Sequence, residues 1–295
     1  MTAAPHELTQ RVLVRMLYDP GFCEAVYAEP AQVLGPLGLD AATVAQIVAH
    51  DRRAFSVDPW RGHRAVSAAL GEAVVTALAM TRLGVSAGDH MEFISGSHFH
   101  RCVMERGVLV FAFFDALGER LDRLAGRLGA GASRRERTAL RVAQNALVLE
   151  RAVAEVRRAR PRPVPGLVVR GAVRGVAVAE GASAAWGRAR ASLGTDPVAA
   201  LVSGSAASKA ALAALFGAEL GQGTECLLVE RPNERGREPA ISFTGPALVG
   251  LLGQAANPVP QEALVAFAEG EGASRAEAEE IVGELIADGL LVAGA

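Results

Sequence analysis

The segment PRPVPG at residues 161–166 divides the chain into two regions with different hydrophobic patterns. Three prolines in six residues cannot continue a helix and favour extended backbone, so the segment is predicted to be a linker. Before it, apolar residues recur at helical spacing, most clearly over residues 133–160. After it, LVVRGAVRGVAVAEG alternates apolar with small or charged residues, as strands do. This change of period predicts an α+β protein.

The chain is predicted to contain three regions. Its 295 residues exceed the roughly 100–150 residues of a common domain, so two or three domains are expected. Residues 1–160 are predicted to form an all-helical domain, residues 161–221 an α/β connecting region, and residues 222–295 a winged-helix-like domain. Aromatic residues make up only 5% of the chain, so Ala, Val and Leu must fill the interior and helices must pack closely.

Short helices with defined ends are predicted at the start of the chain. Asp19-Pro20 should end the first of them, because proline disfavours helical backbone in the residue before it. Asp40 is placed to cap a later helix through its carboxylate. After the turn at Asp58-Pro59-Trp60, residues 61–84 are predicted as one long helix. MEFISGSHFH at residues 91–100 is predicted as an irregular joint.

The region after the linker mixes short strands and helices. ECLLVERP (225–232) and DPVAALVSG (196–204) are predicted as strands, and SKAALAALFGAEL (208–220) as a helix capped by Ser208. The closing region continues with a polar hairpin, a strand, helices at 246–254, 261–269 and 275–288, and a final strand. Ser274 is the predicted cap of the last helix. This order of elements is the outline of a winged-helix-like domain.

The charge and the cysteine content of the chain limit the functions that it can have. The formal net charge of −2 gives no overall attraction to nucleic acid, and Lys209 is the only lysine. Cys23, Cys102 and Cys226 are odd in number and far apart, so neither a disulfide framework nor a Cys-x-x-Cys metal site is available. A reducing cytoplasm is the expected setting, since no secretory signal or membrane-length apolar run is present.

Catalytic and metal motifs are weak in this sequence. His98 and His100 are spaced i, i+2, which separates them on either a helix or a strand, and no third ligand lies at metal spacing, so no metal site is predicted. Neither SGSHFH nor VSGSAASK matches the Gly-x-Ser-x-Gly turn of a serine hydrolase. VSGSAASK also lacks phosphate-loop spacing, so a structural turn is favoured there.

One cluster of side chains has the composition of a protein interface. It surrounds the turn between HDRRAF and DPWRGHRA and contains Arg52, Arg53, Trp60, Arg61 and Arg64. Tryptophan and arginine are enriched in interaction hot spots. A solvated charged rim is the alternative, because charge runs usually lie on solvated faces.

The last helices favour a peptide over DNA as a partner. The segments QEALVAFAEG and RAEAEEIVGEL are acidic and would repel phosphates, whereas DNA-reading winged helices present basic or amide side chains. A winged domain that does not read DNA can instead offer a sheet edge and a helix-lined groove to an extended peptide. Cys226, Leu227, Leu228, Val229 and Glu230 are predicted as that edge strand. The predicted groove wall is formed by Ile281, Leu285, Ile286 and Leu290.

With these residues in view, the chain resembles the partner proteins of multinuclear non-haem iron oxidative enzymes, the methanobactin-type family that modifies ribosomally made peptides. The matching pattern is LYDPGF…V….P..VL..LGLD, then DRRAF, then R-x-x-R-x-x-x-x-x-L-G-E-A at 61–73, and a terminal ELIADGLL. It covers residues 8–83 and 226–292. The last part is similar to a peptide recognition element. The opening helices also look like the small subunit of extradiol-type ring-cleaving dioxygenases, which shares the DP…GL rhythm.

The first resemblance implies a non-catalytic subunit of a heterodimer. It would dock on the iron enzyme through its helical half, using the Arg52, Arg53, Trp60, Arg61 and Arg64 cluster, and hold the leader segment of a precursor peptide on its C-terminal domain. Iron would belong to the partner enzyme, with no cofactor, metal, nucleic acid or membrane bound by this chain. The alternatives are a ring-cleaving dioxygenase small subunit and a winged-helix transcription regulator.

Overall fold

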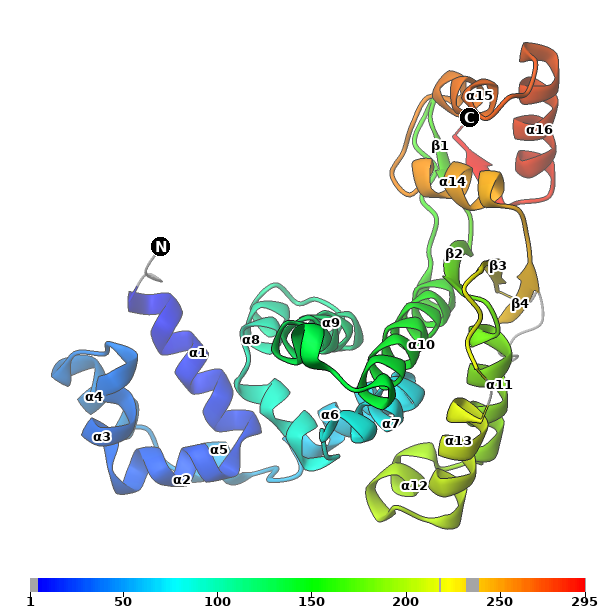
Figure 1. Cartoon of the computed structure of the whole chain (residues 1–295). Coiled ribbons are helices and arrows are strands. Elements are labelled where there is room, and N and C mark those ends of the chain that lie inside the picture. The colour runs from blue at the N-terminus through cyan, green and yellow to red at the C-terminus, as the bar shows by residue number, and fades with distance from the viewer. Residues whose placement is uncertain (1–4, 218, 232–238, 295) are drawn as a thin grey trace. The chain divides into compact units, whose positions relative to one another are not determined.

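The structure is a computed structural model that describes residues 5–217, 219–231 and 239–294. It is 67% helical with 10% strand, which confirms the predicted α+β class. Contacts group the chain into two units (Figure 1). Unit 1 comprises Met1–Leu140 with Thr195–Gly204, and unit 2 comprises Arg141–Gly194 with Ser205–Ala295. These groupings cut across the domain boundaries expected at 160/161 and 221/222.

Unit 1 is built from helices. They are α1 (Pro5–Tyr18), α2 (Pro20–Ala28), α3 (Pro30–Leu34), η1 (Gly35–Leu37), α4 (Ala41–Val48), α5 (Arg53–Ser56), α6 (Arg61–Glu72), α7 (Val74–Met80), η2 (Thr81–Leu83), η3 (Gly88–Ser95), α8 (Ser97–Met104), α9 (Leu109–Leu128), η4 (Gly129–Gly131) and α12 (Pro197–Ser203). The segment expected as an irregular joint is therefore η3 and the start of α8. Helix α10 (Arg134–Arg158) begins in unit 1 and continues into unit 2.

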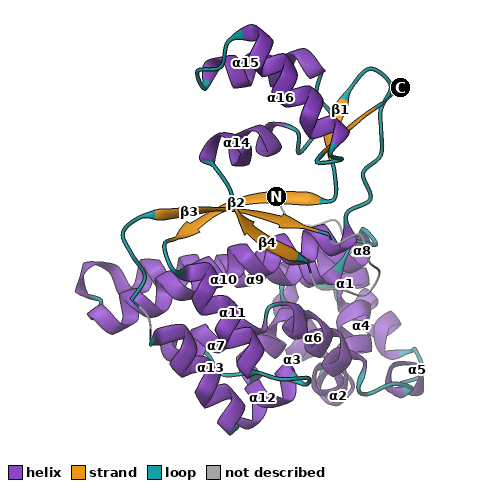
Figure 2. Ribbon diagram, turned by 90° about the vertical axis from the view of Figure 1, so that its right-hand side faces the viewer, coloured by secondary structure: helices purple, strands orange, loops and turns teal. Residues whose placement is uncertain are grey.

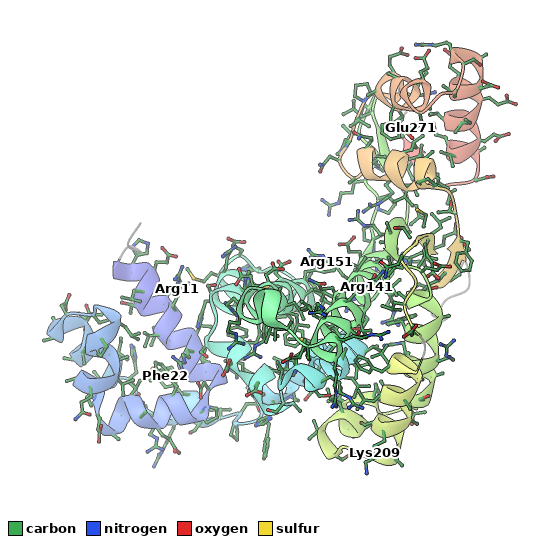
Figure 3. The ribbon with its side chains drawn as sticks, viewed as in Figure 1. Arg11, Phe22, Arg141, Arg151, Lys209 and Glu271 are labelled. Carbon is green, nitrogen blue, oxygen red and sulfur yellow. The ribbon has the colours of Figure 1, made fainter. Side chains whose placement is uncertain are left out.

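Two of the first helices of unit 1, α2 and α4, follow residues whose side chains cap them. Asp19 Oδ1 accepts a hydrogen bond from Phe22 N at 3.0 Å, and Asp40 Oδ1 accepts one from Thr43 N at 2.8 Å. Both carboxylates satisfy amides that the first helical turn leaves free. The predicted end at Asp19-Pro20 and the predicted cap at Asp40 are confirmed. Buried side chains of these helices then form one hydrophobic cluster that includes Val26, Leu34 and Ile47. Phe22, labelled in Figure 3, packs against this cluster.

The prediction of a single long helix over residues 61–84 is wrong. The helix breaks at Ala73, and the segments on its two sides differ in direction by 93°. Every residue of α7 is buried, whereas α6 has one exposed face. A helix that is apolar all round must lie in the interior, so the chain turns inward where the apolar run VVTALAM begins.

The prediction of a strand at DPVAALVSG is also wrong, because this segment forms α12. Asp196 caps it by accepting a hydrogen bond from Ala199 N at 2.9 Å, and Pro197 occupies the first helical position. Proline is favoured there because its missing N–H would have had no helical partner.

Among the described residues, no single helix is long and apolar enough to cross a bilayer, although two bent helix pairs reach that length and composition together.

Unit 2 contains two small antiparallel sheets and five further helices among its described residues. Its elements are β1 (Val168–Arg170), β2 (Val173–Ala179), α11 (Ala182–Ser192), α13 (Ala206–Phe216), β3 (Thr224–Glu230), β4 (Ala240–Phe243), α14 (Pro246–Gln254), α15 (Gln261–Gly270), α16 (Arg275–Ala287) and β5 (Leu291–Ala293). The order of the larger sheet is β2-β3-β4, and β1 pairs with β5. The polar hairpin expected between β3 and β4 lies at residues 232–238, outside the described residues.

The three-stranded sheet lies between two helices, α10 and α14 (Figure 2). Alternate residues of each strand face opposite sides of the sheet. On one face, Leu227 and Val229 pack with Leu149 and Val153 of α10. On the other face, Leu228 packs with the apolar residues of α14. Because both faces are covered, the sheet is open to a partner chiefly along its edges.

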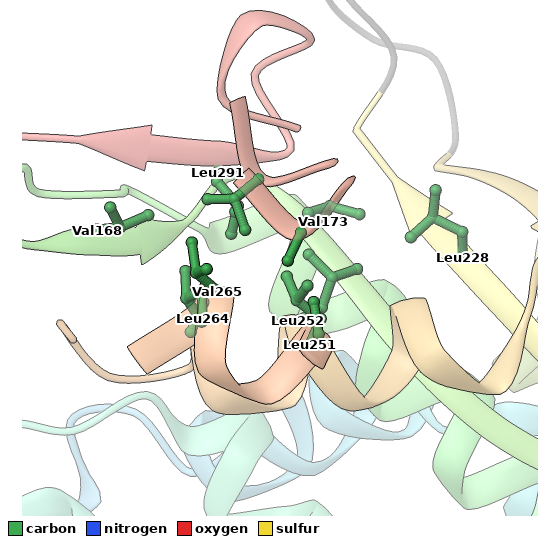
Figure 4. Packing of buried hydrophobic residues seen from close by; sticks show 12 residues of the cluster. Val168, Val173, Leu228, Leu251, Leu252, Leu264, Val265 and Leu291 are labelled. Carbon is green, nitrogen blue, oxygen red and sulfur yellow. The ribbon is translucent and has the colours of Figure 1, made fainter. Parts of the chain in front are cut away.

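The last helices enclose a second core with strands β1 and β5. Val168 and Leu291 from these strands pack against Leu252, Leu264 and other buried side chains of α14–α16 (Figure 4). Val168 also forms a bridge with Val259, which joins the segment between α14 and α15 to the small sheet. Ser274 caps α16, as predicted, and it also forms a capping box with Glu277. The element order matches the predicted outline, and the winged-helix assignment itself stays a prediction.

Helices α13 and α11 differ from what the sequence predicted. Helix α13 begins at Ala206, so its cap is Ser205, whose hydroxyl accepts from the Ser208 amide at 3.4 Å. The expected cap at Ser208 is wrong because that residue is already helical and only 3% exposed. Helix α11 was not predicted, since its stretch of alanines carries no clear apolar stripe.

Candidate functional site

The strand expected at the sheet edge lies at the centre of the sheet. β3 pairs with β2 over all of its residues and with β4 from Leu227 to Glu230. Leu227, Leu228 and Val229 are at most 7% exposed. The edge assignment of residues 226–230 is therefore wrong, because a strand whose neighbours occupy both sides has no free hydrogen-bonding groups for a peptide.

The available edge of this sheet near α14 is β4. Thr244 N donates to Cys226 O, and the register pairs Ser242 with Leu228. In an antiparallel pair, hydrogen-bonded residues alternate with residues that direct their backbone groups away from the partner strand. By that alternation, Ile241 and Phe243 direct their N–H and C=O groups outward. In the part of the chain that the structure describes, no strand pairs with this side of β4.

The side chains of β4 give this edge an apolar character. Phe243 is 75% exposed, although phenylalanine is usually buried. Ile241 lies on the same face of the sheet as Phe243, and it packs against the hydrophobic cluster that Leu227 and Val229 form with α10. An edge with outward backbone groups and an exposed aromatic side chain can bind an extended peptide as an additional strand. The term β4 edge denotes residues 240–243 below.

The predicted groove wall is mainly part of the second core. Leu285, Ile286 and Leu290 are partly buried and pack on the same cluster as Leu228. Ile281 is 40% exposed and lies on the outer side of α16. The structure thus brings Leu228 together with three of the four wall residues, but as packed core rather than as the lining of a groove.

The predicted enzyme-facing cluster lies at the surface of unit 1. Trp60 is 64% exposed, and its neighbour Val57 is 80% exposed. The Trp60 ring packs on the His63 ring at 5.5 Å between centroids. Exposed aromatic and apolar side chains of this kind are typical of interaction sites. The name Trp60 surface denotes Val57, Trp60 and His63 together with the arginines of the cluster, Arg52, Arg53, Arg61 and Arg64.

Three of the four arginines of the Trp60 surface are paired with acidic neighbours. Arg52 Nη2 lies 3.0 Å from Glu24 Oε1, and Arg61 Nε lies 3.8 Å from Asp58 Oδ2. Arg64 also bonds to Asp58 and holds the pKa of that carboxyl below its ordinary value. The structure therefore brings Trp60, Arg61 and Arg64 together around Asp58. Arg53 is exposed and begins α5.

A depression of about 590 Å³ adjoins the Trp60 surface. It is lined by Tyr18, Asp19, Pro20, Gly21, Pro59, Trp60, His63, Met91, Glu92, Ile94 and Ser95. The Asp19-Pro20 step of the LYDPGF segment thus forms one wall, and the turn at Pro59-Trp60 forms another. Two segments separated by about forty residues meet here, which the sequence pattern did not reveal.

His98 and His100 lie in different surroundings on α8. His98 Nε2 lies 2.7 Å from Glu119 Oε1. His100 is 7% exposed, and burial lowers its pKa to about 4. Successive positions i, i+2 on a helix diverge around its axis, as the sequence argument expected. Among the described residues, no three His, Cys, Asp or Glu side chains are grouped closely enough to hold a metal ion.

Comparisons with known proteins leave the family open. No protein-family model matches the chain, and no curated protein matches it significantly.

Sequence reasoning missed Phe243 as a site residue. The signal available to it was AISF, a short alternating run after a polar segment, which marks a strand but not its position in a sheet.

Proposed function

We propose that the chain is a cytoplasmic, non-catalytic partner subunit that binds a ribosomally synthesised precursor peptide and presents it to an iron-dependent oxidative enzyme. In this proposal the β4 edge binds the peptide and the Trp60 surface docks on the enzyme. The iron belongs to the enzyme, as the family resemblance implies. The observation that carries the peptide role is the outward-facing backbone of Ile241 and Phe243.

Strand addition suits a carrier of precursor peptides. Backbone hydrogen bonds from Ile241 and Phe243 are independent of the peptide's sequence, so one edge can hold a leader while the remainder of the peptide varies. Phe243 supplies an apolar contact for alternate peptide side chains. Helix α16 is acidic, with Glu279, Glu280 and Glu284 exposed, so a peptide long enough to reach this helix would be expected to be basic or neutral there.

The peptide role is tested by comparing two substitutions at one position. Phe243→Ala removes the ring and keeps the amide, whereas Phe243→Pro also removes the outward N–H. Proline is tolerated on the outer side of an edge strand because no internal ladder bond is lost. We expect Phe243→Ala to weaken binding of a fluorescent leader peptide and Phe243→Pro to weaken it by about a further two- to tenfold. Equal affinities for all three proteins would contradict the proposal.

The docking role is tested by co-purification. The chain is expressed with its genomic neighbours, captured alone, and the eluate is analysed for iron and for bound peptide. We expect an iron-loaded partner to co-purify and Trp60→Ala to reduce its recovery, because truncating a central tryptophan commonly costs about 2 kcal/mol or more. Val202→Ala is the matched control, since Val202 is 64% exposed on α12. Iron bound by the chain alone, without a partner, would contradict the proposal.

A further inference from the structure

The β4 edge is complementary to a second copy of itself. Its outward-facing residues are Ile241 and Phe243, and Ser242 between them directs its backbone groups toward β3. When a second β4 runs antiparallel with the two Ser242 residues opposite each other, Ile241 of each copy lies opposite Phe243 of the other. Because both residues face outward, this register pairs every outward N–H and C=O of residues 241 and 243.

The residues that flank β4 favour this register over its neighbours. A pairing with Ile241 opposite Ile241 places Phe243 opposite Pro239, which has no N–H to donate. A pairing with Phe243 opposite Phe243 places Ile241 opposite Gly245, the N-cap residue of α14, where the chain leaves the sheet. A shift by one residue sets outward-facing groups against inward-facing ones. Among these registers, the one centred on Ser242 alone satisfies both outward-facing residues in both copies.

The helices that cover this sheet lie over β2 and β3 rather than over β4. Helix α14 follows β4 in the chain but crosses to the far strand, where Val249 lies over Gly175 of β2. On the other face, α10 packs with buried side chains of β2 and β3, and Ile241 is only partly buried in that cluster. The remaining residues of β4 are exposed, namely Ala240, Ser242 and Phe243. Both faces of β4 are therefore less covered than those of its neighbours.

The charge and the area of the edge suit a reversible pairing of two copies. Residues 240–244, AISFT, carry no charge, whereas edge strands are commonly protected by charged side chains or bulges. No like charges therefore lie opposite each other in the pairing. Phe243 is 75% exposed, so pairing covers roughly 150 Å² of apolar surface on each copy. Because stable interfaces bury roughly 1,200 Å² or more, the pairing must be weak and readily reversed.

We propose that two copies of the chain pair through their β4 edges, antiparallel and centred on Ser242, and that this pairing occupies the edge when no peptide is bound. Phe243 then lies beside Ile241 of the other copy, and such pairs of aromatic and β-branched side chains stabilise antiparallel strands. A two-fold axis passes between the two Ser242 residues, so the contact closes at a dimer. The exclusion of a peptide rests on the proposed function, whereas the pairing itself does not.

A cysteine introduced at residue 242 tests the register on the full chain. Opposite residues of a non-hydrogen-bonded antiparallel pair have Cα atoms about 4.5 Å apart, which suits a disulfide. We therefore expect Ser242→Cys to form a disulfide-linked dimer in oxidised glutathione.

Ala240→Cys is the matched control for this experiment. Residue 240 is also exposed and lies on the same face of the same strand. In the proposed register it lies opposite residue 244, so the two copies of residue 240 are about 13 Å apart along the strands and do not cross-link. The unmodified chain measures any background from its three native thiols. Equal cross-linking of the two variants, or none in either, would overturn the proposal.

Sedimentation equilibrium measures the pairing without a cross-link. From about 1 µM to about 1 mM, we expect the unmodified chain to shift from monomer toward dimer. Phe243→Ala removes both rings and should raise the dissociation constant at least about tenfold. Val202→Ala, at an exposed residue of α12, should leave it unchanged. A monomer at every concentration, or equal dissociation constants for Phe243→Ala and the unmodified chain, would overturn the proposal.

The two uses of the β4 edge fail in different ways. Dimers that cross-link through Ser242→Cys, in a chain that does not bind the fluorescent leader peptide, would refute the peptide role and leave the pairing in place. Leader binding by a chain that stays monomeric and does not cross-link would refute the pairing alone. When both hold, excess leader peptide should dissociate the dimer, since one edge cannot pair with two strands.

Discussion

Helix α14 crosses strand β2 with Val249 directly over Gly175. A Cβ atom on residue 175 would lie 2.9 Å from the Cα of Val249 and 3.3 Å from its Cβ. Glycine at this position lets the helix approach the sheet closely enough for Leu251 and Leu252 to reach the second core. The packing of the α14 layer therefore depends on the absence of one side chain.

Substitution of Gly175 by alanine is expected to destabilise unit 2. The added methyl group meets backbone atoms, which cannot move aside as a side chain can, so the cost should be about 1 to 3 kcal/mol in the free energy of unfolding. Urea denaturation measures this quantity. Gly187→Ala in α11 is the control, because nothing lies within 4 Å of a Cβ there and alanine favours helix. Equal losses in both variants would contradict this account.

Glu225 of β3 caps the start of α11. Its two carboxylate oxygens accept from Gly181 N at 2.5 Å and from Ser183 Oγ at 2.7 Å. We expect Glu225→Ala to cost about 1 to 2 kcal/mol, as loss of a helix cap does, and Glu225→Gln to cost less because one acceptor remains. Urea midpoints measure the difference. Thr224→Ala, at an exposed neighbour in the same strand, should leave the midpoint near that of the unmodified chain.

Arg231 binds carbonyl groups at the end of α10. Its Nη2 donates to Val156 O at 2.8 Å and to Ala159 O at 2.9 Å. Cations stabilise helix C-termini, so Arg231→Gln is expected to cost about 1 to 3 kcal/mol. Arg162→Gln removes the same charge at an exposed linker position and serves as the control. Hydrogen exchange of the last α10 amides should accelerate in the first variant alone, and equal rates would contradict the prediction.

Buried histidines predict a loss of stability in mild acid. Burial lowers the pKa of both His90 and His100 to about 4, with smaller contributions from nearby arginines, whereas an unfolded chain protonates histidine near pH 6.5. The stabilisation is fully present above pH 6.5, since both states are then neutral. Between about pH 6.5 and 4 the unfolded state binds protons that the native state excludes, so stability falls by up to about 1.4 kcal/mol per pH unit for each histidine.

Urea denaturation between pH 7 and 5 measures this slope. His90→Phe removes one of the two histidines and should reduce their combined contribution to the slope by about half. His90 packs beside Phe113, so a phenylalanine ring fits the same apolar surroundings. A slope unchanged by His90→Phe would show that this histidine does not exclude protons in the native state.

Helix ends were predictable where a local residue determines them. Asp19, Asp40 and Ser274 each accept from an amide within three residues, so their roles can be inferred from a short stretch of sequence. The α+β class followed from the change of period at residues 161–166. The break at Ala73 was missed because burial on all sides of α7, rather than a proline or glycine, requires it.

The position of a strand in a sheet depends on pairing between distant segments. The alternation in residues 225–232 indicated a strand, but only its pairing with β2 and β4 placed it at the centre and left Ile241 and Phe243 outermost. The same holds for the depression beside Trp60, whose walls come from the Asp19-Pro20 step and the Pro59-Trp60 turn. The sequence by itself thus determined local caps, periods and class, because those depend on neighbouring residues. Tertiary structure alone decided which edges, cavities and buried groups are available for binding, because these arise from contacts between residues far apart in the chain.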